Sequence, residues 1–271
     1  MSEADVQGLF SEAYYRSHCG DRAYQHDEAW QNFFDIVAER IVTDIQPKTV
    51  LDAGCAYGIL VERLRARGVE AWGIDISEYA ISQVAPAVRD FCQVGSILDP
   101  LPATYDLIVS IEVVEHLPEA DSMRAIENLC RHSNDILLSS TPYDYKEPTH
   151  FNVQPPEYWA RQFARHSFYR DLEFDGSFIT PWAARFRRLA GPAPEVIQNY
   201  ERVMWRMKNE LSELRGLAVE QHRLLKEHEA RWAELETGAT WKMVEKIQHL
   251  RTKLIPVGSR RERWLRKIRG K

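Results

Sequence analysis

The sequence predicts an α/β fold in which a doubly wound parallel sheet carries helices on both faces, followed by a helical tail. Short apolar runs end in an acidic residue at Asp52 and again at Asp75, and amphipathic segments alternate with these runs. From Val196 the chain becomes strongly charged, with apolar residues every three or four positions. We expect four parts: a helical cap over 1–46, the α/β domain over 47–190, a long helix over 194–237 and an amphipathic basic segment over 239–271.

Composition sets the broad class of the protein. The 271 residues suffice for one α/β domain with additional segments, and the net charge of −5 is ordinary. No apolar run has the length of a membrane span, and the N-terminus lacks the features of a signal peptide. The four cysteines form no CxxC pair, which argues against zinc and redox sites. We therefore expect a reduced, cytoplasmic protein.

Residues 1–46 are predicted to be helical and are rich in aromatic side chains. Two interpretations stay open. The segment forms a cap that packs on the sheet, or it covers a ligand and brings Tyr24 or Trp30 to it. Both can hold at once, because such caps border the site. The aromatic residues are Tyr14, Tyr15, Tyr24, Trp30, Phe33 and Phe34.

The first strand ends at Asp52 and leads into a turn of small residues, Gly54, Ala56 and Gly58, before a helix begins at Ile59. Small residues let a ligand lie close to the backbone, and the N–H groups of the helix face that ligand. A dinucleotide fingerprint would place glycine at 56 and 59 as well, so a nicotinamide or flavin cofactor is disfavoured. The acid at the strand end favours a cationic ligand that carries an amino-acid group.

The second strand, Val69–Asp75, ends in an acid that lies 23 residues after Asp52. A carboxylate at this place can accept both ribose hydroxyls of a nucleoside. The alternative is a structural role, in which Asp75 caps the helix after Ser77. The third strand is expected within Phe91–Ile97.

The fourth strand, Leu107–Ile111, delivers Glu112, Glu115 and His116 to the edge of the sheet where doubly wound folds bind ligands. Three interpretations compete. The side chains cap or pair locally, they supply a general base for an acceptor hydroxyl, or they bind a divalent metal.

The fifth strand, over 135–142, leads into an irregular loop over 143–156 that holds two tyrosines and His150. Loops after strand ends carry acceptor recognition, so His150 is a candidate base or metal ligand, although a surface histidine is the alternative. A helix over 155–165 and a sixth strand over 169–174 follow. Residues 178–188 form either an antiparallel seventh strand or a helix.

The segments Asp52–Gly58, Asp75 and Tyr105–His116 together resemble the motifs of class I S-adenosylmethionine (SAM)-dependent methyltransferases. Ala56 departs from the glycine of many members, and Ser96 stands where the family often has an acid. The resemblance implies a Rossmann-like fold and a set of residues that bind SAM. These are Tyr24, Asp52, Gly54, Ala56, Gly58, Asp75, Ile76, Ser96, Ile97 and Ile111.

The run Glu112-Val-Val-Glu-His116 is similar to the Glu-x-x-Glu-His of ubiquinone-pathway O-methyltransferases and of small-RNA terminal 2′-O-methyltransferases. The resemblance implies that Mg²⁺ or Mn²⁺ grips two hydroxyls and lowers the pKa of the attacking one. The metal ligands would be Glu112, Glu115, His116 and His150, and the catalytic candidates are His150, His116 and Glu112.

The flanks over 14–34 and 149–188 look like methyltransferases from bacterial glycan-assembly loci, and the tail resembles the layout of chain-terminating O-antigen methyltransferases. This resemblance implies an O-methyltransferase that acts on a sugar hydroxyl of a surface glycan. Two alternatives stay open: an O-methyltransferase for a phenolic, quinone-type or RNA-terminal hydroxyl, and a non-catalytic SAM-binding scaffold for glycan-assembly enzymes.

The tail has a heptad-like apolar stripe from Val196 to Leu235, on a helix of about 60 Å. We expect a coiled coil that binds a second copy or a partner, the alternative being a helix that lies on its own domain.

From Arg251 onward there are nine Lys or Arg and one Glu, with Trp264, Leu265 and Ile268 at helical spacing. This pattern suits an anionic membrane surface, and we expect a cytoplasmic protein that contacts the inner membrane; a plain solvated basic tail is the alternative. A nucleic-acid partner is disfavoured, because the Lys and Arg residues gather at the C-terminus, far from the predicted site.

Overall fold

The computed structural model describes residues 8–17, 22–189 and 193–268. The chain divides into two compact units, Met1–Tyr200 and Glu201–Lys271, which we consider separately. Cys19 and the last basic residues, Arg269 and Lys271, lie outside the described residues, as do the side chains of Leu235, Leu265 and Ile268. The predicted division into a cap, a domain and two tail segments stays a prediction.

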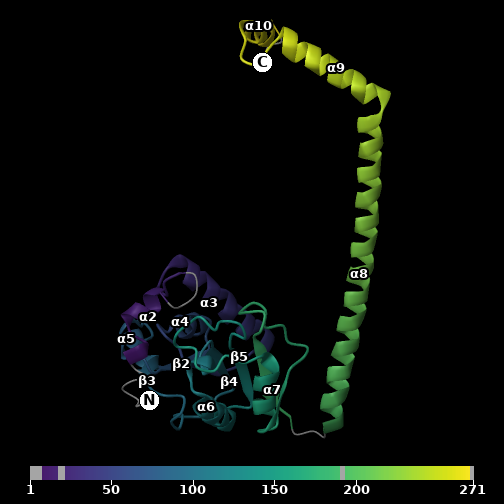
Figure 1. The fold of residues 1–271 in the computed structure, drawn as a ribbon. Helices are drawn as coiled ribbons and strands as arrows, with labels where there is room; N and C mark the ends of the chain where they lie inside the picture. The colour runs from purple at the N-terminus through teal and green to yellow at the C-terminus, as the bar shows by residue number, and fades with distance from the viewer. Residues whose placement is uncertain (1–7, 18–21, 190–192, 269–271) are drawn as a thin grey trace. The chain divides into compact units, whose positions relative to one another are not determined.

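The first unit is built on a seven-stranded sheet with the order β3-β2-β1-β4-β5-β7-β6 (Figure 1). Strands β1 to β5 are parallel, and β7 runs antiparallel to both β5 and β6. The predicted doubly wound α/β sheet is therefore confirmed. The strands are β1 (Thr49–Ala53), β2 (Glu70–Asp75), β3 (Cys92–Val94), β4 (Leu107–Ile111), β5 (Asp135–Ser139), β6 (Phe168–Arg170) and β7 (Ala184–Arg188).

The structure decides the element within residues 178–188, which the sequence left open between a strand and a helix. Residues 184–188 form strand β7 and not a helix. The sixth strand is shorter than predicted and ends at Arg170. The side chain of Asp171 accepts a hydrogen bond from the backbone N–H of Glu173, and this local turn ends the strand before residue 174.

Helices cover both faces of the sheet, because alternate residues of each strand point to opposite sides. On β1, Val50 packs in a core with α3 and α4, whereas Leu51 packs in a second core with α6 and α7. Before α8, the helices among the described residues of this unit are α2 (Glu12–Ser17), α3 (Glu28–Arg40), α4 (Ile59–Ala66), α5 (Glu78–Ser82), α6 (Glu119–His132) and α7 (Pro156–Ala164). Short π and 3₁₀ turns lie at Ile41–Ile45, Arg89–Phe91 and Val114–His116.

The register of the sheet brings the predicted site residues to one edge. Asp52 of β1 pairs with Gly73 of β2 and with Val109 of β4. The carboxyl ends of these three strands therefore lie side by side, and each is followed within a few residues by a predicted site residue. This edge is where open α/β sheets bind ligands.

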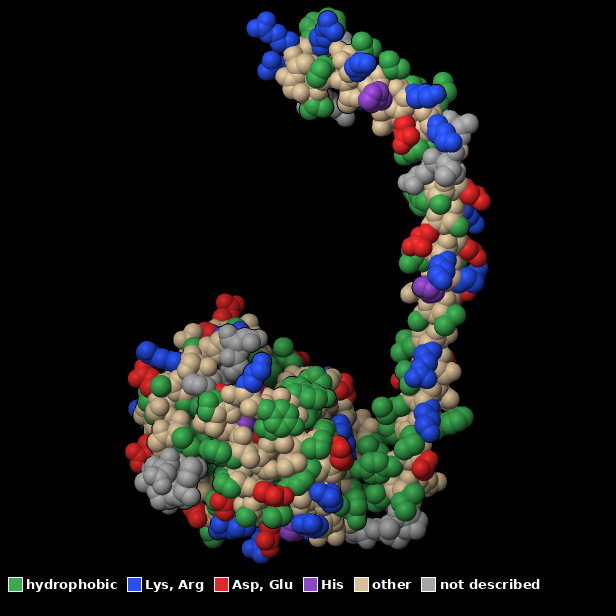
Figure 2. Space-filling view, in the orientation of Figure 1, with side chains coloured by type: hydrophobic (Ala, Val, Ile, Leu, Met, Phe, Trp, Pro, Cys, Tyr) green, Lys and Arg blue, Asp and Glu red, His purple; other side chains and the backbone are tan. Residues whose placement is uncertain are grey.

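The second unit continues α8 (Ala193–Thr237) and adds α9 (Ala239–Leu254) and α10 (Arg260–Ile268). Apolar side chains of α8, among them Leu211, Leu214 and Leu225, are exposed to solvent. Charged side chains of both signs lie along the same helix (Figure 2). The long helix is present, whereas its pairing into a coiled coil stays a prediction. None of the helices in the described chain is both long and apolar enough to cross a membrane.

Candidate functional site

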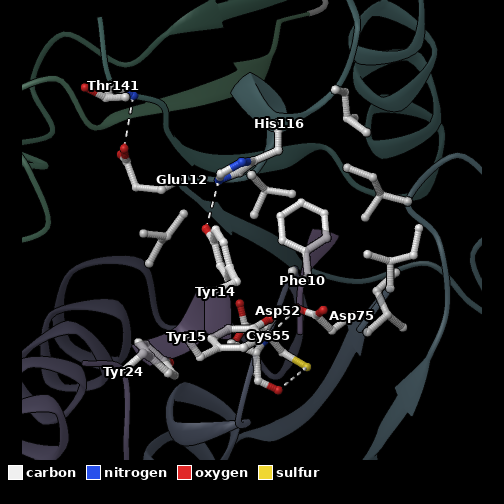
Figure 3. Close-up of a pocket in the computed structure, with 18 of the residues that line it drawn as sticks. Phe10, Tyr14, Tyr15, Tyr24, Asp52, Cys55, Asp75, Glu112, His116 and Thr141 are labelled. Atoms are coloured by element: carbon white, nitrogen blue, oxygen red, sulfur yellow. Dashed lines mark hydrogen bonds between the residues drawn. The ribbon is translucent and has the colours of Figure 1, made fainter. Parts of the chain in front are cut away.

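A cavity of about 680 Å³ opens at the carboxyl edge of the sheet (Figure 3). Its floor comes from the ends of β1, β2 and β4, and one wall comes from the aromatic N-terminal segment. Most of the predicted site residues line this cavity. They are Tyr24, Asp52, Gly54, Ala56, Asp75, Ile76, Ser96, Ile97, Ile111, Glu112, His116 and His150.

The turn after β1 needs a left-handed backbone at three positions. Gly54, Ala56 and Gly58 have φ of 93°, 46° and 67°. A Cβ at Gly54 would lie 2.3 Å from a methyl of Val113, so only glycine fits there. Gly58 is the N-cap residue before α4 and does not line the cavity; a Cβ at this place would meet the Cys92 sulfur at 2.9 Å. Its role is to let the turn pack on β3.

Asp75 is buried, and backbone donors fix its carboxylate. The N–H of Ala56 donates to Oδ2 at 2.8 Å, and the N–H of Ser77 donates to Oδ1 at 2.9 Å. Burial raises the pKa of Asp75, and these two hydrogen bonds oppose the rise. Each carboxylate oxygen has two lone pairs, so both can still accept a ligand hydroxyl. The structural alternative also holds in part, since Asp75 orders the start of α5, where Ser77 is the N-cap.

Asp52 lines the same part of the cavity. Burial, and after it the charge of Asp75, raises the pKa of Asp52 to about 8. Two buried carboxyls close together disfavour each other's ionisation, and a cation placed between them would reverse that effect. The pair is therefore suited to a ligand that carries an ammonium group.

The turn after β3 forms the third side of this half of the cavity. Ser96 and Ile97 both line it. The hydroxyl of Ser96 accepts a hydrogen bond from the N–H of Leu98 at 3.1 Å, and the side chain of Asn128 donates to the carbonyl of Ile97 at 2.9 Å. These bonds hold the turn in place beside the end of β2.

Glu112 follows β4 in a left-handed conformation with φ of 52°, which is unusual for a residue with a side chain. Three donors hold its carboxylate at the cavity. Trp182 Nε1 donates to Oε1 at 2.9 Å and the N–H of Thr141 donates to Oε2 at 3.1 Å, while the hydroxyl of Ser139 donates to Oε1. A side chain so fixed can orient an acceptor group.

Glu115 behaves differently. It is fully buried, lies outside the cavity lining and accepts a bond from the N–H of Thr141 at 3.3 Å. Burial, together with the charge of Glu112, holds the pKa of Glu115 well above its usual value, which favours the neutral acid. Its Oε2 atom has no hydrogen-bond partner within the described chain.

His116 and His150 face the cavity with their rings 4.6 Å apart. His116 Nδ1 lies 3.1 Å from the carbonyl of Thr149, and Nε2 lies 3.3 Å from the hydroxyl of Tyr14. Burial lowers the pKa of His116 to about 3, so its imidazole is neutral near pH 7. His150 Nδ1 lies 2.8 Å from the carbonyl of Asp144, which leaves Nε2 as the acceptor nitrogen.

The four predicted metal ligands do not form a ready coordination shell. In the part of the chain that the structure describes, no group of three or more His, Cys, Asp or Glu side chains is arranged to hold a metal ion. Two of the four residues are not available to a metal ion in the cavity. The hydroxyl of Tyr14 contacts His116 Nε2, and Glu115 does not line the cavity.

Several lining residues were not among the predicted site residues. They come from the N-terminal segment and from the loops after β5 and before β7: Phe10, Tyr14, Tyr15, Arg22, Thr141, Asp144, Thr180 and Trp182. The aromatic content of residues 1–46 was the available signal for the first group. The position of Trp182 depends on an antiparallel edge that the sequence left undecided.

Comparison with known proteins places the chain in a family. The family described as "Methyltransferase domain" matches residues 24–175. The ubiquinone biosynthesis O-methyltransferase of Pseudomonas paraeruginosa is 32% identical over 102 residues, which are 34% of this chain and 44% of the relative. That of Neisseria meningitidis serogroup C is 30% identical over 121 residues, or 41% and 51%. The chain thus spans about half the length of these curated relatives.

The structure of magnesium protoporphyrin IX methyltransferase from Synechocystis PCC 6803 with bound SAH is similar in fold. It aligns with a TM-score of 0.55 at 18% identity and covers 69% of this chain and 100% of that one. At this identity the likeness shows the fold alone.

Proposed function

Because the chain belongs to the methyltransferase-domain family, as its motifs predicted, we propose that it is a SAM-dependent O-methyltransferase acting on a sugar hydroxyl of a bacterial surface glycan. One observation carries the proposal. A single cavity holds the carboxyls of Asp52 and Asp75 at one end and Glu112 and two imidazoles at the other. The first end suits the cofactor and the second suits an acceptor hydroxyl.

The residues of the first end fit SAM. Asp75 would accept the ribose hydroxyls, Asp52 would face the ammonium group, and the turn at Ser96 and Ile97 would border the adenine. The absence of a side chain at Gly54 lets Val113 pack against the turn, because a Cβ there would lie 2.3 Å from a Val113 methyl. When bound, SAM supplies an electrophilic methyl group.

At the second end, His150 is the proposed base. Its Nδ1–H donates to the carbonyl of Asp144, which fixes the tautomer and leaves Nε2 free to take the proton of an acceptor hydroxyl. Glu112 would accept a hydrogen bond from a neighbouring hydroxyl. Much of the rate is expected from holding the hydroxyl in line with the methyl group.

Metal assistance through Glu112, Glu115, His116 and His150 is the second mechanism. The carboxyls of Glu112 and Glu115 both accept from the N–H of Thr141, and a cation beside them would favour ionisation of Glu115, which burial otherwise disfavours. The contact of Tyr14 with His116 Nε2 speaks against it. Chelation with EDTA separates the two: turnover that survives EDTA favours the direct base.

The sugar acceptor is supported by the polar and aromatic lining of the second end, where Glu112, Asp144 and Trp182 combine hydrogen-bond acceptors with an indole. A phenolic or quinone-type acceptor is the second candidate. It is favoured by the names of the two relatives described above and by the rings of Phe10 and Tyr14.

Calorimetric titration with SAM, repeated with Mg²⁺, Mn²⁺ and EDTA, tests the cofactor. Radiolabelled SAM with glycan, nucleotide-sugar and catechol acceptors then tests the acceptor class. Binding of SAM without methylation of any acceptor would favour a SAM-binding scaffold, and no binding under any condition would overturn the enzyme.

The tail carries two proposals that concern partners. We propose that the apolar stripe of α8 pairs with a second copy, because ion pairs of Arg223 with Glu220 and Glu227 occupy a face separate from Leu211, Leu214 and Leu225. The basic side chains over α9 and α10, visible in Figure 2, are proposed to contact an anionic membrane surface. Co-sedimentation with anionic and neutral lipid vesicles tests the second proposal, and equal binding to both would contradict it.

A further inference from the structure

The N-terminal segment contacts both ends of the cavity within five residues. At the cofactor end, the hydroxyl of Ser77 donates to the carbonyl of Phe10 at 2.6 Å, in a buried position. The N–H of the same Ser77 donates to Asp75. The backbone at Phe10 is therefore attached to the residue that orders the Asp75 carboxylate.

At the acceptor end, Tyr14 lies against His116 (Figure 3). The Nδ1 atom of His116 is 3.1 Å from the carbonyl of Thr149, which accepts the only proton of the neutral ring. Nε2 is then an acceptor, and the Tyr14 hydroxyl at 3.3 Å is its donor. The ring of Phe10 also meets His116 edge-on, with centroids 5.3 Å apart. His116 is thus enclosed and cannot also receive an acceptor proton without losing Tyr14.

The other side of His116 supports the loop at 143–152, here called the acceptor loop. The carbonyl of Thr149 accepts a hydrogen bond from His116 Nδ1, and the hydroxyl oxygen of Thr149 lies 3.0 Å from the same nitrogen. The next residue, His150, packs its ring on His116. Further along, the N–H of Asn152 donates to the carbonyl of Glu115 at 2.9 Å. The loop is consequently held to residues 115 and 116 at two points that flank the proposed base.

We propose that Tyr14 is a positioning residue of the acceptor site: through His116 it fixes the loop that carries His150, so that ordering of the SAM side also orders the base. The chain of contacts runs from Asp75 through Ser77 and Phe10 to Tyr14, and from there to His116. The inference rests on the proposed function, because that function assigns the base to His150. In this arrangement His116 is a positioning residue as well.

The arrangement predicts that cofactor binding orders the loop that carries His150. Contacts of the cofactor with Asp75 stabilise the segment at Phe10, and the same segment presents Tyr14 to His116. The loop at 143–152 should then be better ordered with cofactor than without it, although the cofactor does not need to touch that loop. Coupling between sites requires such a shared element.

Hydrogen exchange of the full chain, with and without S-adenosylhomocysteine (SAH), tests the proposal. SAH is expected to slow exchange in the loop at 143–152 by about tenfold in the unmodified protein. Tyr14→Phe removes one hydroxyl, and SAH should then protect the Asp75 region but no longer this loop. Tyr79→Phe is the matched control, because Tyr79 packs on Tyr15 in the same aromatic cluster yet does not line the cavity.

A second readout reports on His116 itself. Histidine ¹⁵N NMR should show Nε2 of His116 shifting towards a free acceptor nitrogen in Tyr14→Phe and staying unchanged in Tyr79→Phe. A loop that responds to SAH equally in Tyr14→Phe and in the unmodified protein would overturn the proposal. If SAH protects no part of the unmodified protein, the proposed function fails. The positioning role is then judged in the free protein: faster loop exchange in Tyr14→Phe than in Tyr79→Phe supports it, and equal exchange refutes it.

Discussion

The carboxylate of Asp75 accepts a hydrogen bond from the backbone N–H of Ala56 across 2.8 Å, joining the end of β2 to the turn after β1. Ala56 has φ of 46°, a conformation that costs energy for a residue with a Cβ. The bond to Asp75 offsets that cost and aims the carboxylate at the cavity. One side chain therefore both shapes the turn and serves as the proposed ligand for ribose.

Asp75→Asn is expected to weaken SAM binding roughly 10- to 100-fold, because hydrogen bonds to a charged group contribute about 1.5–3 kcal/mol. Calorimetric titration measures the change. Asp106→Asn is the control: Asp106 also accepts backbone N–H bonds, from Lys48 and Thr49, but at the opposite end of β1. Equal losses of SAM affinity in both variants would show that Asp75 acts through stability alone.

Asp52 makes the free energy of unfolding depend on pH. Its pKa is about 8 in the folded protein and close to its usual value near 4 when unfolded. Between pH about 4 and about 8, Asp52 is therefore protonated in the folded state and ionised in the unfolded state. This contribution to stability is therefore complete below pH ~4 and is lost as pH rises towards about 8.

Asp52→Asn is accordingly expected to raise stability by roughly 1–3 kcal/mol at pH about 8 and to have little effect near pH 4. The same variant should bind SAM more weakly, since the carboxylate is lost. Thermal unfolding across this pH range measures the first effect and calorimetry the second. A variant as pH-dependent in stability as the unmodified protein would contradict the assignment.

Gly54→Ala is expected to destabilise the protein strongly for two reasons, a φ of 93° and a contact of 2.3 Å between the new Cβ and Val113. Gly68→Ala measures the backbone effect without the steric contact, because Gly68 has φ of 82° and an added Cβ there would have nothing within 4 Å. We expect a loss of about 1–2 kcal/mol at Gly68 and roughly 1–3 kcal/mol more at Gly54. Denaturant unfolding gives both values, and equal losses would exclude the steric contribution.

Self-association through α8 predicts that removing apolar stripe residues dissociates the protein. Leu211→Ala with Leu225→Ala should weaken association by tenfold or more, since a buried leucine contributes about 1.5–3 kcal/mol. Arg223→Ala is the control on the ion-paired face, where exposed pairs contribute little. Light scattering measures the mass. An unmodified protein with the mass of one chain would refute the pairing.

The predictable part of the site follows from strand ends. Asp52 and Asp75 were both predicted to bind SAM, each at the end of a short apolar run, and the parallel pairing of β1 with β2 brings the two strand ends to one edge. Tyr14 and Trp182 were not predicted as site residues. One reaches the cavity from a helix 102 residues from His116, and the other contacts Glu112 across 70 residues.

By itself the sequence determined the α/β class, the methyltransferase motifs and the long charged helix, because each depends on local periodicity or on a short run of residues. Tertiary structure alone decided that Gly58 packs on β3, that Glu115 is buried behind the lining and that His116 joins the N-terminal segment to the acceptor loop. These outcomes depend on which atoms meet across the fold. A histidine two residues after a buried valine reads the same in sequence whether a hydroxyl, a metal or water meets its free nitrogen.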